Sequence, residues 1–270
     1  MFLLLKSDGS ALYSTKDIEL AFKKDKDYQA DRQIIIVDVR QSLYFKQVFA
    51  TLKALGFKKQ MAHLAYDFVT LPEGTMSSRK GLIVTYEDLR DTMRAHLTEE
   101  TKQRHADWSS KKIEKTAITL ATASMSFMML RQDPESIIIF DMREAMSVDG
   151  FTGPYILYTV ARIESLLKKG KNKTEISGAW LTDACEIELV KHLAEFPEVI
   201  RHAGKSFAIS AVAAWAFDTA KTFNEYYHSV KIIGDDNKDR MAARLALTLA
   251  TKQTLTNAMK LLGIDVLREM

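Results

Sequence analysis

The sequence predicts an incomplete doubly wound α/β unit followed by an all-α helical bundle. The first stretch alternates apolar strand-like runs with helical windows, which is the order expected of a doubly wound sheet. From about Thr85 onward, apolar residues recur at helical spacing in several long windows. The chain of 270 residues has only four prolines and 11 glycines, which favours long helices over a turn-rich β architecture.

Three strand-like runs define the α/β part. Phe2–Leu5 is a short apolar run that ends at a Ser-Asp-Gly-Ser turn signal. Ile34–Val37 is apolar on both faces, as buried parallel strands are, and alternation at Leu64, Tyr66 and Phe68 predicts a third strand. Three strands make a small sheet, so the α/β unit is expected to be incomplete.

Two helices are expected between these strands. Ser14 and Asp17 have the spacing of a capping box, which predicts a helix from Thr15 to about Lys24. The second helix is predicted from apolar residues that share one face before a stop at Gly56, namely Phe45, Val48, Phe49, Leu52 and Leu55.

The rest of the chain is predicted to be helical. Thr85 and Asp88 form another capping-box pattern, and Pro134 follows a long window at Lys111–Leu130. Gly150 and the Gly153-Pro154 pair mark the clearest domain boundary. Helical windows follow near Pro154–Lys169, Leu181–Phe196, Phe207–Tyr227 and Lys238–Leu262. We therefore divide the chain into residues 1–84, 85–150 and 151–270.

Composition excludes some classes of function. A formal charge of +3 is too small to indicate nucleic-acid binding by itself, and a cationic run from Arg162 to Lys173 is better explained by a solvated helix end. Cys185 is the single cysteine, so no intramolecular disulfide is possible, and the histidines lack zincin spacing; no metal site is expected. Met1–Leu5 is too short for a signal peptide or a membrane span, which predicts a cytoplasmic protein without a membrane partner.

The strongest chemical signal is the loop Thr75–Gly81, which reads Thr-Met-Ser-Ser-Arg-Lys-Gly. Two adjacent cations and two hydroxyls suit a loop that closes over a polyphosphate. Arg79 and Lys80 can offset the charge that develops on a leaving pyrophosphate. Taken alone, the segment favours a solvated surface loop.

A second signal lies in the helical part. Tyr155, Tyr158 and Arg162 are spaced by three and four residues, so they share one helical face. Two rings and a guanidinium on one face make a stacking platform for unpaired bases. The competing interpretation is an aromatic stripe that faces the core, against which the presence of Arg162 argues.

These segments together resemble the arginyl-tRNA synthetases, which are class I aminoacyl-tRNA synthetases. The loop is similar to the class I signature, with Thr75 where the family usually has lysine. Ser7–Asp17 resembles the segment that binds the substrate arginine. Phe140–Ile163 resembles the start of the anticodon-binding domain, and Leu261–Met270 resembles the family's C-terminal segment, with Met270 as its natural end.

The resemblance implies a role for each matching residue. It implies half of a Rossmann-like catalytic domain at 1–84, a helical connecting region at 85–150 and an all-α anticodon-binding domain at 151–270. The implied catalytic residues are Ser77, Ser78, Arg79 and Lys80, with Met76 and Gly81 contacting ATP. Arginine is expected at Tyr13, Asp17 and Gln41, and the anticodon at Tyr155, Tyr158, Arg162, Tyr226 and Met270. The family often has histidine at the place of Tyr44.

The implied function is that of an arginine–tRNA ligase, which activates arginine with ATP and transfers it to tRNA-Arg. ATP with Mg²⁺ is expected as co-substrate, with no tightly bound cofactor, and the protein is expected to be a monomer. The family's His-Ile-Gly-His-type motif and tRNA-elbow domain are not in this sequence. We therefore expect a truncated or split enzyme whose half is inactive alone.

Two other functions compete with this interpretation. One is a non-catalytic tRNA-binding module or paralogue, against which the retained Tyr13, Asp17, Gln41 and the intact loop argue. The other is an unrelated α/β nucleotide-binding protein, which should carry a glycine-rich phosphate loop that this sequence lacks.

Overall fold

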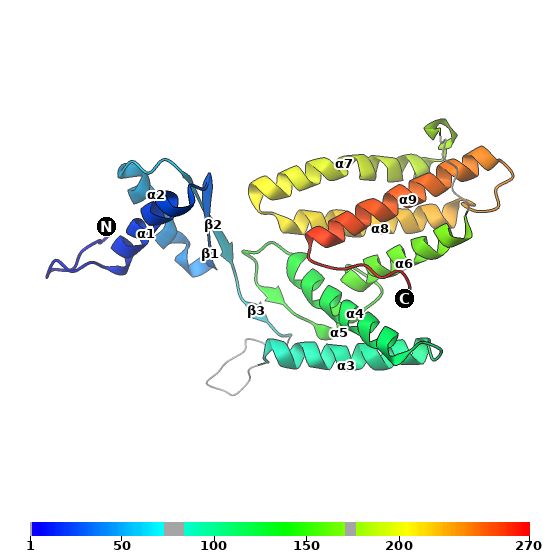
Figure 1. Cartoon of the computed structure of the whole chain (residues 1–270), viewed down its shortest axis with the longest axis horizontal. Helices are drawn as coiled ribbons and strands as arrows, with labels where there is room; N and C mark the ends of the chain where they lie inside the picture. Colours follow the sequence, from blue (N-terminus) through cyan, green and yellow to red (C-terminus); the bar gives the residue numbers. More distant parts are fainter. Residues whose placement is uncertain (1, 73–83, 171–176) are drawn as a thin grey trace. The chain divides into compact units, whose positions relative to one another are not determined.

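The computed structural model describes residues 2–72, 84–170 and 177–270. The chain forms two compact units (Figure 1). The α/β unit comprises Met1–Val69 with Pro134–Ile138, and the helical unit comprises Thr70–Asp133 with Ile139–Met270. Of the helices in the described ranges, none combines the length and the apolar character that a membrane span requires.

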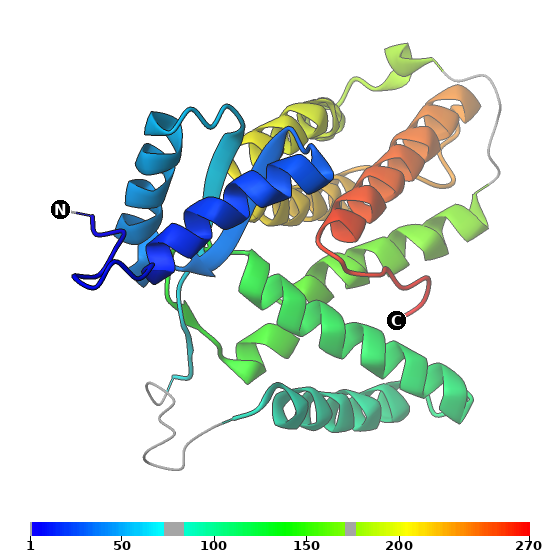
Figure 2. The ribbon, with the colours of Figure 1, turned by 60° about the vertical axis from the view of Figure 1, so that its left-hand side comes forward.

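The α/β unit is built on two parallel strands, β1 (Arg32–Asp38) and β2 (Gln60–Tyr66), which pair from Arg32 with Gln60 to Asp38 with Tyr66. Helix α2 (Ser42–Ala54) connects them, preceded by the 3₁₀ turn η1 (Val39–Gln41). Helix α2 and helix α1 (Tyr13–Tyr28) lie on one face of the strands (Figure 2). The core between them is formed by Ile18, Ala21, Phe45, Val48, Leu52 and Phe57.

Two strand predictions need correction. Phe2–Leu5 is not a strand of the parallel sheet, because Leu5 forms only an isolated antiparallel bridge with Ala11 across a turn. Ile34–Val37 does form β1, but it is covered on one face only. Ile34 and Ile36 are 43% and 63% exposed, since both helices of the unit pack on the opposite face.

The predicted capping box at Ser14 and Asp17 is also wrong. Helix α1 begins at Tyr13, two residues before the predicted start, and its N-cap Leu12 makes no side-chain cap bond. The Ser14 hydroxyl instead donates to the carbonyl of Leu3, 2.7 Å away. The Asp17 carboxylate therefore does not cap α1, and it is available for the arginine contact that the family resemblance implies.

The helical unit contains α3 (Tyr86–Arg104), α4 (Ser110–Leu130), α5 (Met142–Met146), α6 (Gly153–Lys169), α7 (Ala184–Ser206), α8 (Ile209–Ser229) and α9 (Lys238–Leu261), with a short 3₁₀ turn η3 (Gly178–Trp180). Short strands β3 (Val69–Thr70) and β4 (Ile138–Ile139) pair where the chain passes between the two units. The capping box at Thr85 and Asp88 is confirmed.

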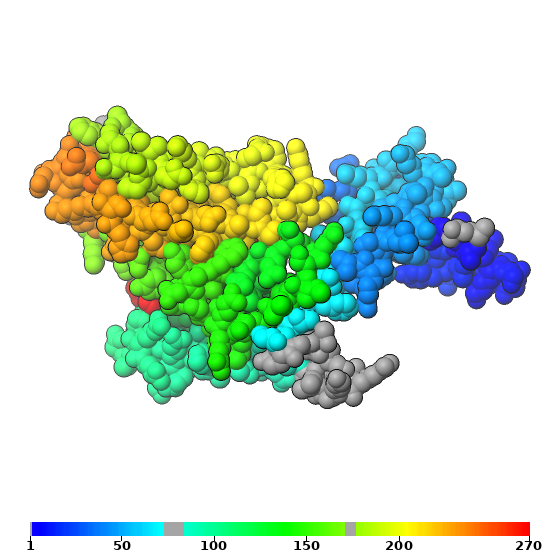
Figure 3. Space-filling model, turned by 180° about the vertical axis from the view of Figure 1, so that it is seen from behind, coloured from blue at the N-terminus to red at the C-terminus, as the bar shows by residue number. Residues whose placement is uncertain are grey.

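Helix α7 continues past the predicted end at Phe196, with Pro197 inside it. Proline removes one backbone donor and normally breaks the ladder. Here Trp215 of α8 donates its indole N–H to the carbonyl of His192, 3.0 Å away, and its ring packs on Phe196 at 4.4 Å. Tertiary contacts at the proline thus hold the helix together. Helices α7 and α8 form one continuous surface in Figure 3.

Candidate functional site

Tyr13, Asp17 and Tyr44 form a cluster in the α/β unit. Tyr13 and Asp17 lie one turn apart on α1, and Tyr44 projects from the first turn of α2. The Tyr44 hydroxyl donates to Oδ2 of Asp17 at 2.5 Å, and the Tyr13 and Tyr44 rings stack with centroids 5.2 Å apart. Burial and the bond to Asp17 raise the pKa of the Tyr44 phenol above its usual range, so Tyr44 stays protonated and keeps donating.

This arrangement suits a cationic ligand. Tyr44 holds one carboxylate oxygen of Asp17 and fixes the orientation of the other. Tyr13 is 61% exposed, so its ring and the Asp17 carboxylate together present an aromatic face and an acceptor toward solvent. Both residues also line a cavity of about 120 Å³ with Lys24 and Gln33. A planar guanidinium can stack on the ring and donate to the carboxylate.

Gln41 lies at the carboxyl end of β1, where ligands of open α/β sheets bind. It is the last residue of η1, whose N-cap Asp38 accepts a bond from the Arg40 backbone N–H. Bonds from Arg40 and then Gln41 hold the pKa of the Asp38 carboxyl below its usual value. Tyr44 follows Gln41 by one turn and bonds Asp17, which links the segments, while direct proximity of Gln41 to Asp17 stays a prediction.

The helical unit carries an aromatic and cationic surface on α6 and α8. The Arg162 guanidinium lies 4.9 Å from the centroid of the Tyr158 ring and 5.3 Å from that of Tyr227. Its Nη1 donates to Oδ1 of Asn224 at 2.6 Å. Asn224 in turn donates to the Tyr155 hydroxyl at 3.0 Å. Arg162 is thus held in place by side chains from two helices, while Tyr158 remains 39% exposed.

Beside this surface is an open pocket of about 440 Å³, which we call the aromatic pocket. Tyr158 and Arg162 of α6 line it together with His105 and Trp108, which lie between α3 and α4, and with Met270. The rings of His105 and Trp108 stack with centroids 3.9 Å apart and planes within 11°. A flat, unpaired base can stack against such rings, and the guanidinium adds positive charge beside them.

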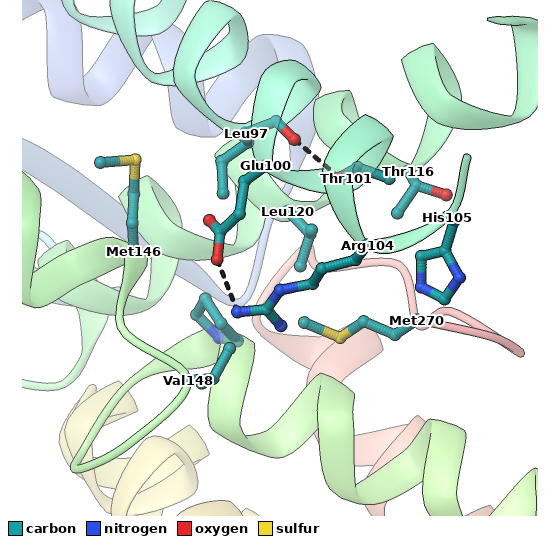
Figure 4. Close-up of a pocket in the computed structure, with 11 residues that line it drawn as sticks. Leu97, Glu100, Thr101, Arg104, His105, Thr116, Leu120, Met146, Val148 and Met270 are labelled. Atoms are coloured by element: carbon teal, nitrogen blue, oxygen red, sulfur yellow. Dashed lines mark hydrogen bonds and ion pairs between the residues drawn. The ribbon is translucent and has the colours of Figure 1, made fainter.

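Met270 also lines a small inner cavity between α3, α4 and α6 (Figure 4). That cavity is lined by Leu97, Leu120 and Met146 on its apolar side and by Arg104, which bonds Glu100 across a turn of α3. Met270 therefore lies between the interior of the helical unit and the aromatic pocket. Its side chain anchors the C-terminal segment next to His105.

Comparison with known proteins identifies the family. The family model of the class I (R) tRNA synthetase catalytic domain matches residues 1–141, more than half of the chain. The model of the DALR anticodon binding domain matches residues 156–270. The chain belongs to the arginyl-tRNA synthetase family. The resemblance inferred from the sequence and the predicted fold class are confirmed.

Arginyl-tRNA synthetase relatives match the chain along almost all of its length. The chain is 39% identical to an arginine–tRNA ligase of Bdellovibrio bacteriovorus and 34% identical to one of Treponema pallidum, covering 99% of this chain and 47% of each relative. The arginyl-tRNA synthetase of Thermus thermophilus superposes with a TM-score of 0.89 at 26% identity, covering all of this chain and 51% of that one. The chain spans about half the length of the relatives it matches.

Tyr226, which the family resemblance placed at the anticodon, lies in the core of the helical unit. Tyr226 is fully buried, and its hydroxyl donates to the carbonyl of Arg244 at 3.2 Å. Burial raises the pKa of its phenol above the usual range. Its ring is not available to stack on a base, because the core side of α8 encloses it. The neighbouring Tyr227 lies beside Arg162 instead, with the guanidinium 5.3 Å from its ring centroid.

The sequence did not single out His105 and Trp108, which line the aromatic pocket. It did single out Tyr155, which is not among the residues that line the pocket. A tryptophan in a polar stretch between two helices was the available signal for the first pair. Tyr155 packs on Phe217 with centroids 5.2 Å apart and bonds Asn224, so it supports Arg162 rather than forming the pocket wall. The synthetase signature loop Thr75–Gly81 lies outside the described residues, and the roles of its residues stay predictions.

Proposed function

We propose that the chain is part of an arginine–tRNA ligase, which uses ATP to activate arginine and transfers it to tRNA-Arg. In this proposal the chain supplies half of the arginine site, the loop over pyrophosphate and the anticodon-binding domain. The protein acts as a cytoplasmic monomer. The observation that carries the proposal is the aromatic pocket, in which a tyrosine, a held guanidinium and a stacked histidine surround a space of about 440 Å³.

In the arginine site, Asp17 accepts hydrogen bonds from the substrate guanidinium. Tyr44 occupies Oδ2 of Asp17, so the second oxygen faces the ligand. The Tyr13 ring provides a flat surface for the guanidinium plane. Gln41 adds a polar contact from the end of β1. A charge-assisted pair of this kind selects arginine over lysine, because lysine presents a point charge instead of a planar fork.

The reaction chemistry is assigned to the loop Thr75–Gly81. Arg79 and Lys80 offset the charge on the leaving pyrophosphate, Ser77 and Ser78 add hydrogen bonds, and Met76 and Gly81 contact ATP. Mg²⁺ arrives with ATP, because Mg²⁺ is commonly held through substrate phosphates. No tightly bound cofactor is assigned.

Titration of the chain with two RNAs tests the proposal. One is an arginine-accepting tRNA, and the other is the same tRNA with changed anticodon bases. The arginine-accepting tRNA should bind more tightly than the tRNA with changed anticodon bases. Replacement Tyr158→Ala should weaken its binding by about 1–3 kcal/mol, because one base loses its stacking partner. It should also remove most of the difference between the two RNAs.

The matched control is Tyr28→Ala, since Tyr28 is a 78% exposed tyrosine at the end of α1 in the other unit. It should leave both affinities unchanged. Equal affinity of the unmodified chain for the two tRNAs would refute the anticodon assignment. Such a result would leave a helical domain that attracts RNA only by charge.

A further inference from the structure

The helical unit has a second, larger groove, of about 920 Å³, which shares Glu269 with the aromatic pocket. Helices α4, α6 and α9 and the C-terminal segment line it. Its cationic side chains are Lys112, Lys115, Lys168, Lys252, Lys260 and Arg268, against three carboxylates. We call it the cationic groove. Six cations and three carboxylates give the groove a formal charge of +3, which equals the net charge of the whole chain. The positive excess of the chain is therefore concentrated in this groove.

Helical spacing builds this groove. Lys112, Lys115 and Thr119 recur at three and four residues on α4, and Lys252, Thr256 and Lys260 recur at four on α9, so each row lies on one helical face. Hydroxyls thus lie in line with ammonium groups on both walls: a threonine follows two lysines on α4, and a threonine separates two lysines on α9. Both kinds of side chain are common donors to RNA phosphates.

Glu269 occupies the centre of the charge arrangement. Its carboxylate bridges two lysines from different helices, with Lys112 Nζ at 2.5 Å and Lys168 Nζ at 2.6 Å. These bonds lower the pKa of the carboxyl to about 2, and the side chain is still 43% exposed. Lys112 also lies 3.6 Å from the Trp108 ring centroid, next to the base pocket. An anion bound between Lys112 and Lys168 would therefore lie where the cationic groove meets the aromatic pocket.

The remaining four cations of the groove differ in whether a carboxylate of the chain pairs with them. Lys252 pairs with Glu164 at 3.1 Å. Lys115, Lys260 and Arg268 are exposed and have no ion-pair partner within the residues that the structure describes. The groove therefore has charge available for an external anion even while Glu269 is in place.

We propose that the cationic groove binds the phosphodiester backbone of the RNA whose base enters the aromatic pocket, and that Glu269 is an internal anion displaced by a phosphate from Lys112 and Lys168. This inference rests on the proposed function and adds the path of the strand. RNA fits better than an acidic protein, because a stacking pocket for bases adjoins a row of point charges for phosphates. Lysine is suited to this role as a flexible point charge.

The test measures the affinity of the chain for an arginine-accepting tRNA over a range of salt concentrations. Each cation that contacts a phosphate contributes about 0.7–0.9 to the slope of log K against log salt. The double variant Lys115→Ala/Lys260→Ala should therefore lower the slope by about 1.4–1.8. The exposed Lys221 of α8 lies outside the groove, and Lys221→Ala should leave the slope unchanged.

The variant Glu269→Gln should change the salt slope in the opposite direction. Release of Lys112 and Lys168 should tighten tRNA binding and steepen the slope by about 0.7 for each lysine that gains a phosphate. Both slope changes should be the same for a tRNA with altered anticodon bases, because backbone contacts carry no sequence information. Circular dichroism confirms that each variant is folded.

Three results would overturn the inference. One is an unchanged slope in the double lysine variant. Another is unchanged or weaker binding by Glu269→Gln, which would make Glu269 a structural or base-contacting residue. The last concerns polyglutamate as a model of an acidic protein: the double lysine variant would lose as much affinity for polyglutamate as for tRNA. Each is separable from failure of the proposed function, because base discrimination by Tyr158 is measured independently of the salt slope.

Discussion

Arg244 on α9 is the centre of a buried charge network in the helical unit. Its guanidinium bonds Glu186 at 2.6 Å, Asp183 at 2.6 Å and Asp235 at 3.0 Å. Arg244 is 5% exposed and Glu186 is fully buried. The network ties the start of α7 and the segment between α8 and α9 to α9. A buried charge is tolerated only while it is paired and hydrogen-bonded.

Replacement Arg244→Met should strongly destabilise the helical unit. Asp183 is half exposed and Asp235 keeps Arg240, so most of the cost comes from Glu186, which retains only the backbone N–H of Asp183. Removal of one partner from a buried pair costs about 3–5 kcal/mol. At about 2–4 °C per kcal/mol for a domain of this size, the Tm should fall by about 6–20 °C.

The chain allows this unit to be observed separately. Its three tryptophans, Trp108, Trp180 and Trp215, all belong to the helical unit. Tryptophan fluorescence during urea or thermal unfolding therefore reports that unit and not the α/β unit. Trp215 is the best probe of the region, since it is buried and packs between α7 and α8.

Two further variants sharpen the test. Arg240→Met breaks a pair with the same Asp235, but Arg240 is 41% exposed in its side chain, so it should cost at most about 1 kcal/mol. Glu186→Gln added to Arg244→Met removes the unpaired charge and keeps the helix cap, so it should restore part of the loss. A cost below about 1 kcal/mol for Arg244→Met, or no recovery in the double variant, would refute the reasoning.

Two other predictions concern substrate binding and pH. Under the proposed function, Asp17→Asn should raise the arginine KM of tRNA arginylation by a factor equivalent to about 1.5–3 kcal/mol, because a charge-assisted bond is lost. Steady-state kinetics with an unchanged KM would contradict the arginine site. The free energy of unfolding of the helical unit should fall as pH drops from about 4.5 to 2, because the folded-state pKa values of Asp235 and Glu269 are about 2, below their ordinary 3.8 and 4.5, so the unfolded chain binds more protons there. Unfolding at a series of acidic pH values, followed by tryptophan fluorescence, measures this dependence. Glu269→Gln should make the free energy of unfolding depend less steeply on pH. A free energy of unfolding that rises toward pH 2 would contradict the prediction.

Local sequence determined the features that depend on residues a few positions apart. The Thr85 and Asp88 capping box, the stop of α2 at Gly56 and the start of α6 after Thr152 follow from backbone donors that nearby side chains satisfy or from a positive φ that glycine tolerates. The shared face of Tyr158 and Arg162 also follows from helical spacing alone. The family resemblance rests on such ordered local segments.

Tertiary structure decided which side of each helix is buried and which distant residues meet. Tyr226 and Tyr227 are neighbours in the sequence, yet one faces the core and the other faces Arg162, because about 100° of helical rotation separates them and only the packing of α8 against α6 and α9 selects the side. His105 and Trp108 meet Met270 across more than 160 residues of chain, and Ser14 bonds Leu3 instead of capping α1. No local propensity encodes these contacts, since their energy comes from burial and from partners that only the folded chain brings together.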